Sequence, residues 1–102
     1  MKAPENWTEV IEGKRYSTKT ATLLAGDDYW DGNNFERGGT NQFLYRTPRG
    51  AYFLITLTQW EGARNMLEVI KDPEQARNMF EGLPEKRVSY EEAFPDFKIE
   101  DA

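Results

Sequence analysis

Hydrophobic and polar positions alternate most clearly in the middle of the chain. Residues 42–46 and 51–58 are rich in aromatic and β-branched residues, and Thr-Pro-Arg-Gly at residues 47–50 separates them. Pro48 presets φ at the first central position of a turn, and Gly50 accepts positive φ. The pattern therefore predicts a β-hairpin of these two strands. Because side chains alternate across a strand, the face of the second strand expected to meet the core carries Phe53, Ile55 and Leu57.

A helical period follows further along the chain. Asp72 is a suitable N-cap, and Pro73 suits the first helical position. Gly82 and Pro84 are expected to end the helix. The apolar stripe at i, i+3, i+4 and i+7 consists of Ala76, Met79, Phe80 and Leu83. A helix this short needs a sheet to pack on.

Weaker signals complete the expected fold. Further extended segments are predicted over residues 14–17, 18–25 and 66–70, although alanine and leucine leave a helix open in the second of them. Residues 26–40 are rich in Asp, Asn and Gly and predict a long loop or an irregular hairpin. Residues 1–12 and 98–102 are expected to be loosely ordered. The sequence thus predicts one α+β domain, an antiparallel sheet of four or five strands with one helix from the second half of the chain on one face.

Composition narrows the chemistry. The chain has no cysteine and no histidine, so disulfides, thiolate metal sites and a serine–histidine catalytic pair are excluded. The acidic run that starts at Asp27 does not fit an EF-hand loop, because its third position is Tyr29 and its twelfth is Gly38. No glycine-rich phosphate-binding motif is present. We therefore expect no enzyme activity, no cofactor and no metal.

The net charge of the chain indicates which charge a binding partner would carry. With 18 acidic and 13 basic residues the chain has a net charge of −5. Binding to a phosphate backbone needs clustered lysine and arginine, whereas an acidic protein suits a basic partner. The same charge would also serve only to keep a small domain soluble. No apolar run is long enough to span a bilayer, and residues 1–6 lack the apolar core of a signal peptide, so a cytoplasmic location is expected.

Candidate partner-binding residues come from two classes. Tyr29, Trp30 and Trp60 lie beside polar turn residues rather than in apolar runs, which fits either an interface anchor or the edge of the core. The acidic candidates are Asp27, Asp28, Asp31, Glu36, Glu91 and Glu92. Together these nine residues are the predicted partner-binding set.

Two stretches carry a resemblance. Residues 13–21 follow G-K-x-Y-x-T-x-T-A and residues 44–54 follow L-Y-R-T-x-x-G-x-x-F-L, with an E-x-A segment at residues 74–76. Over residues 13–83 the chain resembles a family of small uncharacterised bacterial proteins, except in residues 23–42. The resemblance implies a sheet with a helix and a setting in phages, plasmids or other mobile elements, but no activity.

The function expected from these observations is a non-catalytic protein-binding module. Some anti-CRISPR proteins are similar in size and charge, so the expected partner is a host protein or nucleoprotein complex such as a CRISPR effector. An acidic surface would occupy its basic groove. One alternative is a nucleic-acid-binding accessory protein that uses Arg46 and Arg49 with the hairpin tyrosines Tyr45 and Tyr52. Another is a structural protein that self-associates through the exposed hairpin edge.

Overall fold

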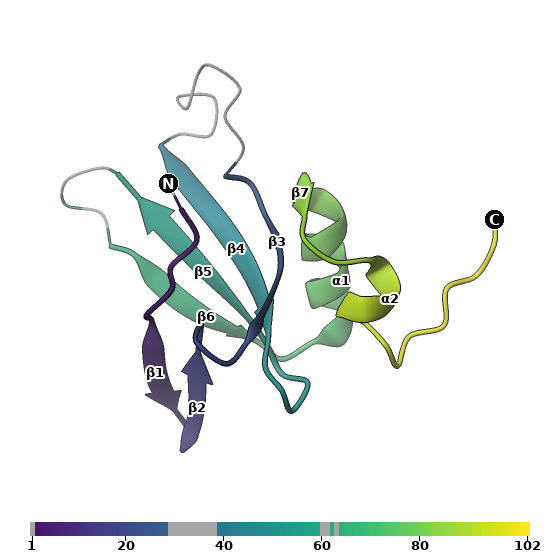
Figure 1. Ribbon diagram of the computed structural model, residues 1–102, viewed down its shortest axis with the longest axis horizontal. Helices are drawn as coiled ribbons and strands as arrows, with labels where there is room; N and C mark the ends of the chain where they lie inside the picture. Colours follow the sequence, from purple (N-terminus) through teal and green to yellow (C-terminus); the bar gives the residue numbers. More distant parts are fainter. Residues whose placement is uncertain (1, 29–38, 60–61, 63) are drawn as a thin grey trace.

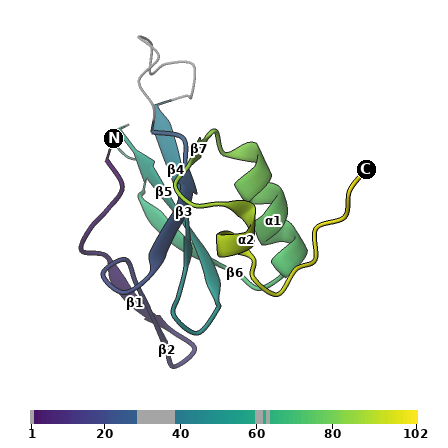
Figure 2. The same ribbon diagram turned by 45° about the vertical axis from the view of Figure 1, so that its right-hand side comes forward.

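The computed structural model describes residues 2–28, 39–59, 62 and 64–102. Over these residues the chain forms a five-stranded antiparallel sheet, with helices on one side and a small two-stranded hairpin on the other. Figures 1 and 2 show this arrangement from two directions. The α+β class and the helix packed on one face of an antiparallel sheet are confirmed. Most of the predicted loop at residues 26–40 lies outside the described residues.

The large sheet has the strand order β6-β5-β4-β3-β7. Every neighbouring pair in it is antiparallel. Its strands are β3 (Thr22–Gly26), β4 (Thr40–Arg46), β5 (Tyr52–Thr58), β6 (Met66–Ile70) and the short β7 (Glu85–Lys86). The longest strands, β4 and β5, are therefore central, and β6 and β7 form the two edges.

The central hairpin forms as the sequence predicts. Arg46 pairs with Tyr52, and the ladder continues without a shift to Thr40 and Thr58. Gly50 has φ of 88°, and its N–H donates to the carbonyl of Thr47 at 2.9 Å. Positive φ at this position is the conformation that glycine adopts without strain.

A second hairpin corrects the expectation for the start of the chain. Residues 1–12 are not loosely ordered throughout, because β1 (Thr8–Ile11) pairs with β2 (Lys14–Ser17). Glu12 and Gly13 connect the two strands, with φ of 52° and 75°. Positive φ at both positions of a two-residue connection is the type I′ geometry, whose twist matches that of the flanking strands.

The strand predicted over residues 18–25 begins later than expected. Its first residues form a turn after β2, in which the Ala21 N–H donates to the Ser17 carbonyl at 3.0 Å. β3 then runs from Thr22, and its pairing with β4 shifts between Leu23 and Ala25. Thr18 and Thr20 thus belong to a turn. The Thr20 hydroxyl donates to the Ser17 carbonyl at 3.5 Å, and the Thr18 hydroxyl accepts from the Trp7 N–H at 3.0 Å.

The helix α1 (Pro73–Gly82) begins as predicted, with Asp72 as its N-cap. The Asp72 carboxylate accepts from the Glu74 N–H at 3.0 Å. The helix ends at Gly82, as predicted, although Gly82 does not take positive φ. Instead the extended residue Leu83 is the C-cap, and its N–H donates to the Met79 carbonyl at 3.0 Å.

Both faces of the sheet are buried, which corrects the expectation of one core face. Phe53 and Ile55 pack beneath the N-terminal hairpin with Tyr16 and Tyr45. On the opposite face the buried cluster contacts α1 and the short helix α2 (Tyr90–Ala93), and it includes Leu44, Tyr52, Leu54, Ile70, Phe80 and Phe94. A strand that is buried on both faces is hydrophobic along its whole length. Its sequence therefore does not show which face packs against the core.

Candidate protein-binding surface

Charge divides unevenly along the chain. Residues 72–102, called the helical segment from here on, contain nine acidic and four basic residues, whereas residues 1–71 contain nine of each. The helical segment therefore carries the whole net charge of −5. Of its nine acidic residues only Glu85 is not exposed. The negative potential of the molecule accordingly centres on the helical side of the sheet.

The basic residues of the helical segment are mostly engaged locally. Arg87 lies beside Asp28, the Lys86 ammonium donates to the main-chain carbonyls of Glu81 and Leu83, and the Arg77 guanidinium lies 4.0 Å from the ring centre of Phe97. Lysine bound to the last carbonyls of a helix also neutralises its negative end. Three of the four cations thus have partners inside the fold, which leaves the exposed carboxylates dominant on this side.

Two predicted residues, Glu91 and Glu92, lie on α2 within this surface. The Glu92 N–H donates to Ser89 Oγ at 3.1 Å, and the Ser89 hydroxyl lies 3.1 Å from Glu92 Oε1. Serine three residues before glutamate is a capping sequence, and here it holds α2 at its first turn. Glu91 is exposed, and no hydrogen bond of its side chain occurs among the described residues. Glu91 is thus free to meet a partner, whereas Glu92 also holds the fold.

The other two described acidic candidates serve the fold. Asp27 Oδ1 accepts from the Gln42 N–H at 2.7 Å and from Asn41 Nδ2 at 3.2 Å, which holds the end of β3 to β4. Both oxygens of Asp28 accept from Arg87, at 2.8 and 2.7 Å. Both bonds come from one guanidinium nitrogen, Nη2, and hydrogen bonds between charged groups are stronger than neutral ones. The two aspartates therefore tie β3 to its neighbours rather than face a partner freely.

Aromatic side chains support the acidic surface from below. Phe80 packs edge-on against Tyr90 and Phe94, with ring centres 5.6 Å apart in each pair. The Tyr90 hydroxyl donates to Glu81 Oε2 at 3.0 Å. Desolvation raises the pKa of the Tyr90 phenol, and the hydrogen bond to Glu81 adds to the increase. Glu81 is thereby held on the surface by a neutral donor.

Five predicted residues fall outside the described part of the chain: Tyr29, Trp30, Asp31, Glu36 and Trp60. The sequence reasoning also passed over exposed carboxylates of the helical segment, among them Glu74, Glu81 and Asp96. A count of charges in successive segments would have drawn attention to them, since the imbalance is confined to residues 72–102.

The hairpin tyrosines do not form the stacking face that nucleic-acid binding would need. Tyr45 is 2% exposed and packs under the N-terminal hairpin, whereas Tyr52 is 9% exposed and packs under the helices. The Tyr52 hydroxyl also donates to the Ala93 carbonyl at 2.9 Å. Stacking on bases requires exposed rings on one surface. These two rings are buried on opposite faces of the sheet.

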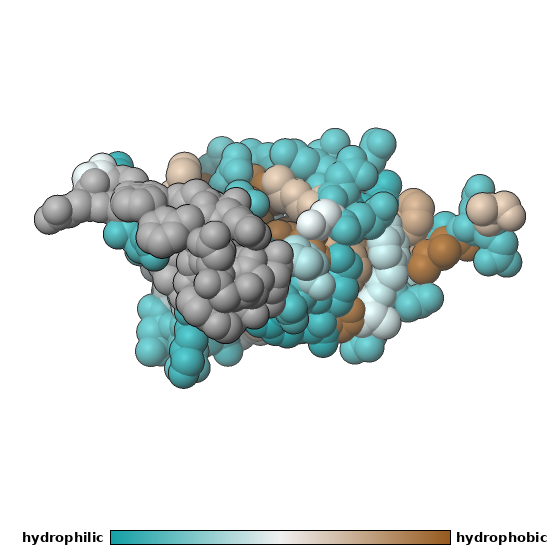
Figure 3. All heavy atoms as spheres, turned by 90° about the horizontal axis from the view of Figure 1, so that it is seen from above, coloured by the Kyte–Doolittle hydropathy of each residue, from teal (hydrophilic) through white to brown (hydrophobic). Residues whose placement is uncertain are grey.

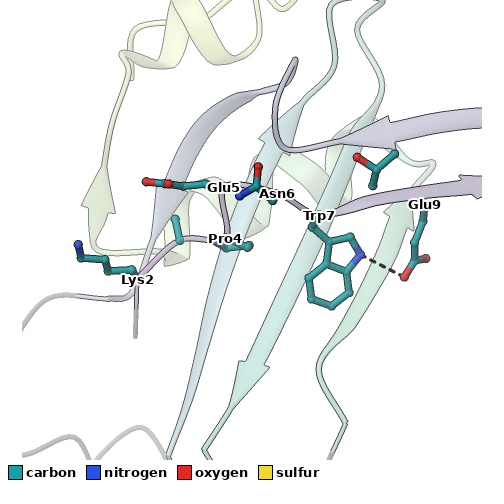
Figure 4. Close-up of a pocket in the computed structure, with 8 residues that line it drawn as sticks. Lys2, Pro4, Glu5, Asn6, Trp7 and Glu9 are labelled. Atoms are coloured by element: carbon teal, nitrogen blue, oxygen red, sulfur yellow. Dashed lines mark hydrogen bonds between the residues drawn. The ribbon is translucent and has the colours of Figure 1, made fainter.

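One surface hollow is lined by residues 2–9 alone, and in it the Trp7 indole donates to Glu9 Oε1 at 3.1 Å (Figure 4). A hollow formed by one chain segment lacks the convergent groups from several elements that define a ligand site. Among the residues described, no group of three or more acidic side chains is close enough to hold a metal ion.

In the described residues no helix has the length and apolar character needed to cross a membrane. Comparison with known proteins finds no matching family, no matching curated protein and no matching solved structure. The resemblance over residues 13–83 therefore stays a prediction, and the charge distribution is the main guide to function.

Proposed function

We propose that this chain is a non-catalytic protein-binding module that acts in the cytoplasm and binds a basic protein surface through its helical segment. The observation that carries the proposal is the confinement of the net charge of −5 to residues 72–102. Four of the exposed carboxylates, Glu74, Glu81, Glu91 and Glu92, lie on helices that are held by caps and by an aromatic cluster. A fixed array of one sign of charge favours encounter with a partner of the opposite sign.

The partner is a host protein or nucleoprotein complex with a groove built for nucleic acid. Such a groove is lined by lysine and arginine because it neutralises phosphates, so an acidic protein surface competes for it. The resemblance to small mobile-element proteins supports an inhibitor, and anti-CRISPR activity against a CRISPR effector is its most specific form. Compared with the sequence-based prediction, this places the main contact on the helical segment rather than on Asp27 and Asp28.

The identity of the partner is tested by recovery from a host lysate. The full chain, carrying a tag on residue 1, is incubated with lysate treated with nuclease, and recovered proteins are identified by mass spectrometry. A nucleic-acid-handling complex that survives the treatment is the expected result. Recovery that disappears with the nucleic acid would instead favour the nucleic-acid-binding alternative.

The role of the helical segment is tested by charge reversal with a matched control. Glu74→Lys with Glu91→Lys reverses two exposed carboxylates in it, whereas Lys substitution of Glu5 makes one such change outside it. Each reversed charge near a basic groove is expected to cost about 1 kcal/mol or more, or roughly fivefold to tenfold in affinity. We expect the double variant to lose most of its binding and the Glu5 variant to keep it. Equal affinities for all three proteins would disprove the proposed surface.

A further inference from the structure

The sheet has one edge strand long enough to accept another strand. Among the described residues β6 pairs with β5 on one side only, and it is the outer strand of the sheet. Met66 and Glu68 in it are exposed, whereas Leu67 and Val69 on its other face are half-buried. The opposite edge, β7, has only two residues. β6 therefore offers main-chain groups beside a partly apolar face, which is the arrangement used in strand addition.

A candidate strand lies beyond α2. Residues 95–102, called the tail from here on, run Pro-Asp-Phe-Lys-Ile-Glu-Asp-Ala and form no helix or strand. Apolar and charged side chains alternate in it from Pro95 to Glu100, and Phe97 and Ile99 are 42% and 45% exposed. Alternation with period two is the pattern of a strand with one apolar face. In Figure 3 hydrophobic residues are visible on the segment that projects beyond the helical side.

The tail lies on the side of the molecule away from β6 of its own chain. It follows α2, which packs on the helical side of the sheet, and Figures 1 and 2 show it running away from the sheet. In the single chain Phe97 is held at the helices, because its N–H donates to the Phe94 carbonyl at 3.1 Å and the Arg77 guanidinium lies over its ring; the exchange would replace these contacts. β6 lies at the edge far from β7, the strand that precedes α2. A second copy is therefore the natural source of a tail for β6.

One antiparallel register matches the two segments. With Lys98 opposite Glu68, Phe97 lies opposite Val69 and Ile99 lies opposite Leu67. The exposed apolar side chains of the tail then extend the apolar face of β6, and an opposite-charge pair forms on the other face. Aromatic–β-branched pairs and opposite-charge pairs across strands each stabilise a sheet.

The neighbouring registers are each unfavourable at Glu68. A slip of one residue places Phe97 or Ile99 opposite this carboxylate and turns the apolar face outward. A slip of two residues places Asp96 or Glu100 opposite it, and like charges directly opposite are destabilising. Antiparallel pairing of β6 with β6 of another copy, centred on residue 68, would oppose two Glu68 side chains. In that register the charge pattern favours the tail over a second β6.

From these observations we propose that two copies of this chain form a dimer by exchanging tails, each tail adding as an antiparallel strand to β6 of the other copy with Lys98 opposite Glu68. Reciprocal exchange is a closed arrangement, since each copy uses the same two surfaces. The exchange uses β6 and the tail, which is the last part of the helical segment, and it does not use the carboxylates on α1 and α2.

Mass measurement with charge-swap variants is the first test. Sedimentation of the full chain over a concentration series should show a species of twice the 11.9 kDa mass of one chain. Lys98→Glu and Glu68→Lys should each shift dissociation to at least fivefold higher concentration, and the two together should restore it. Lys19→Glu, the same charge change in an exposed turn, should leave it unchanged. A chain that is monomeric throughout, or a dimer that all these variants leave unaltered, overturns the proposal.

The register is tested by cross-linking, which the absence of native cysteine makes unambiguous. Phe97→Cys with Val69→Cys should oxidise to a covalent dimer, because residues directly opposite in a sheet are within reach of a disulfide. Phe97→Cys with Met66→Cys should not, since position 66 lies on the other face of β6. A covalent monomer would show the tail folding back onto its own β6, and a dimer from the second pair would show another register; either result contradicts the exchange.

Discussion

The two faces of the central sheet are covered in different ways. On the helical face, side chains from α1 and α2 pack on the sheet and join a continuous aromatic cluster. On the hairpin face, a small two-stranded unit covers Phe53 and Tyr45, and its Ile11 and the preceding Trp7 are only half-buried. Val10 of this unit is 64% exposed. The helical face therefore anchors the fold and carries the excess negative charge, whereas the hairpin covers the other face with fewer buried side chains.

The largest expected effect is on the helical face. Phe80→Ala removes a ring that is 2% exposed and packs against Tyr90 and Phe94. Truncation of a buried phenylalanine costs about 3–5 kcal/mol of the free energy of unfolding. Urea unfolding of the variant should show this loss, with hydrogen exchange faster across the sheet as a whole. A loss confined to the residues of α1 and α2 would mean that the helices do not anchor the fold.

A pH-dependent effect is expected on the hairpin face. Burial raises the pKa of Tyr45 from 10.0 to about 12, and its hydroxyl donates to the Pro4 carbonyl at 3.2 Å. Because the neutral phenol is favoured in the folded state, its stabilisation is complete below pH 10 and is lost as the pH rises from 10 towards 12. The loss amounts to about 3 kcal/mol at most for a shift of this size.

The measurement compares two proteins. Tyr45→Phe cannot titrate at this position, and at neutral pH it loses only the hydrogen bond to Pro4, worth about 1 kcal/mol. Unfolding free energies measured below and above pH 10 should therefore fall more steeply in the parent chain than in the variant. Parallel pH profiles would show that the Tyr45 phenol is not held neutral by burial.

The smallest expected losses of stability come from two single substitutions, one in the N-terminal hairpin and one at the start of α1. Gly13→Ala places a methyl group at φ of 75°, with no neighbouring atom within 4 Å, so its cost is conformational and about 1 kcal/mol. Asp72→Ala removes the N-cap of α1 at a similar cost of about 1 kcal/mol.

Hydrogen exchange separates these two variants. Gly13→Ala should speed exchange in β1 and β2 while α1 stays protected, because the hairpin opens as a light cover. Asp72→Ala should instead lower the protection of the sheet and helices together. Identical exchange patterns for the two substitutions would remove the distinction between the faces.

Local signals in the sequence accounted for the elements whose formation depends on near neighbours. Pro48 with Gly50 predicted the central turn, and Asp72 with Pro73 predicted the start of α1, because turn and cap geometry is decided within a few residues. The prediction was wrong where the same residues suit either a strand or a turn. The threonines of residues 18–20 form a turn rather than a strand.

The candidate surface was only partly predictable for a related reason. Glu91 was recognised as exposed charge, but Asp28 pairs with Arg87, which lies 59 residues away in the chain. Asp27 similarly binds Asn41 and Gln42 across the sheet. The local sequence around a carboxylate does not show whether its side chain faces solvent or pairs with an arginine far away in the chain.

The sequence by itself determined the α+β class, the central hairpin, the capped helix and the exclusion of histidine and cysteine chemistry. Only the tertiary structure decided that both faces of β5 are buried, and that Tyr45 and Tyr52 lie under different covers. It also decided that β6 is the accessible edge, whereas the predicted hairpin is central. The physical reason is that strand order and face coverage depend on contacts between residues far apart in sequence, and alternation within one strand does not encode what packs on each side.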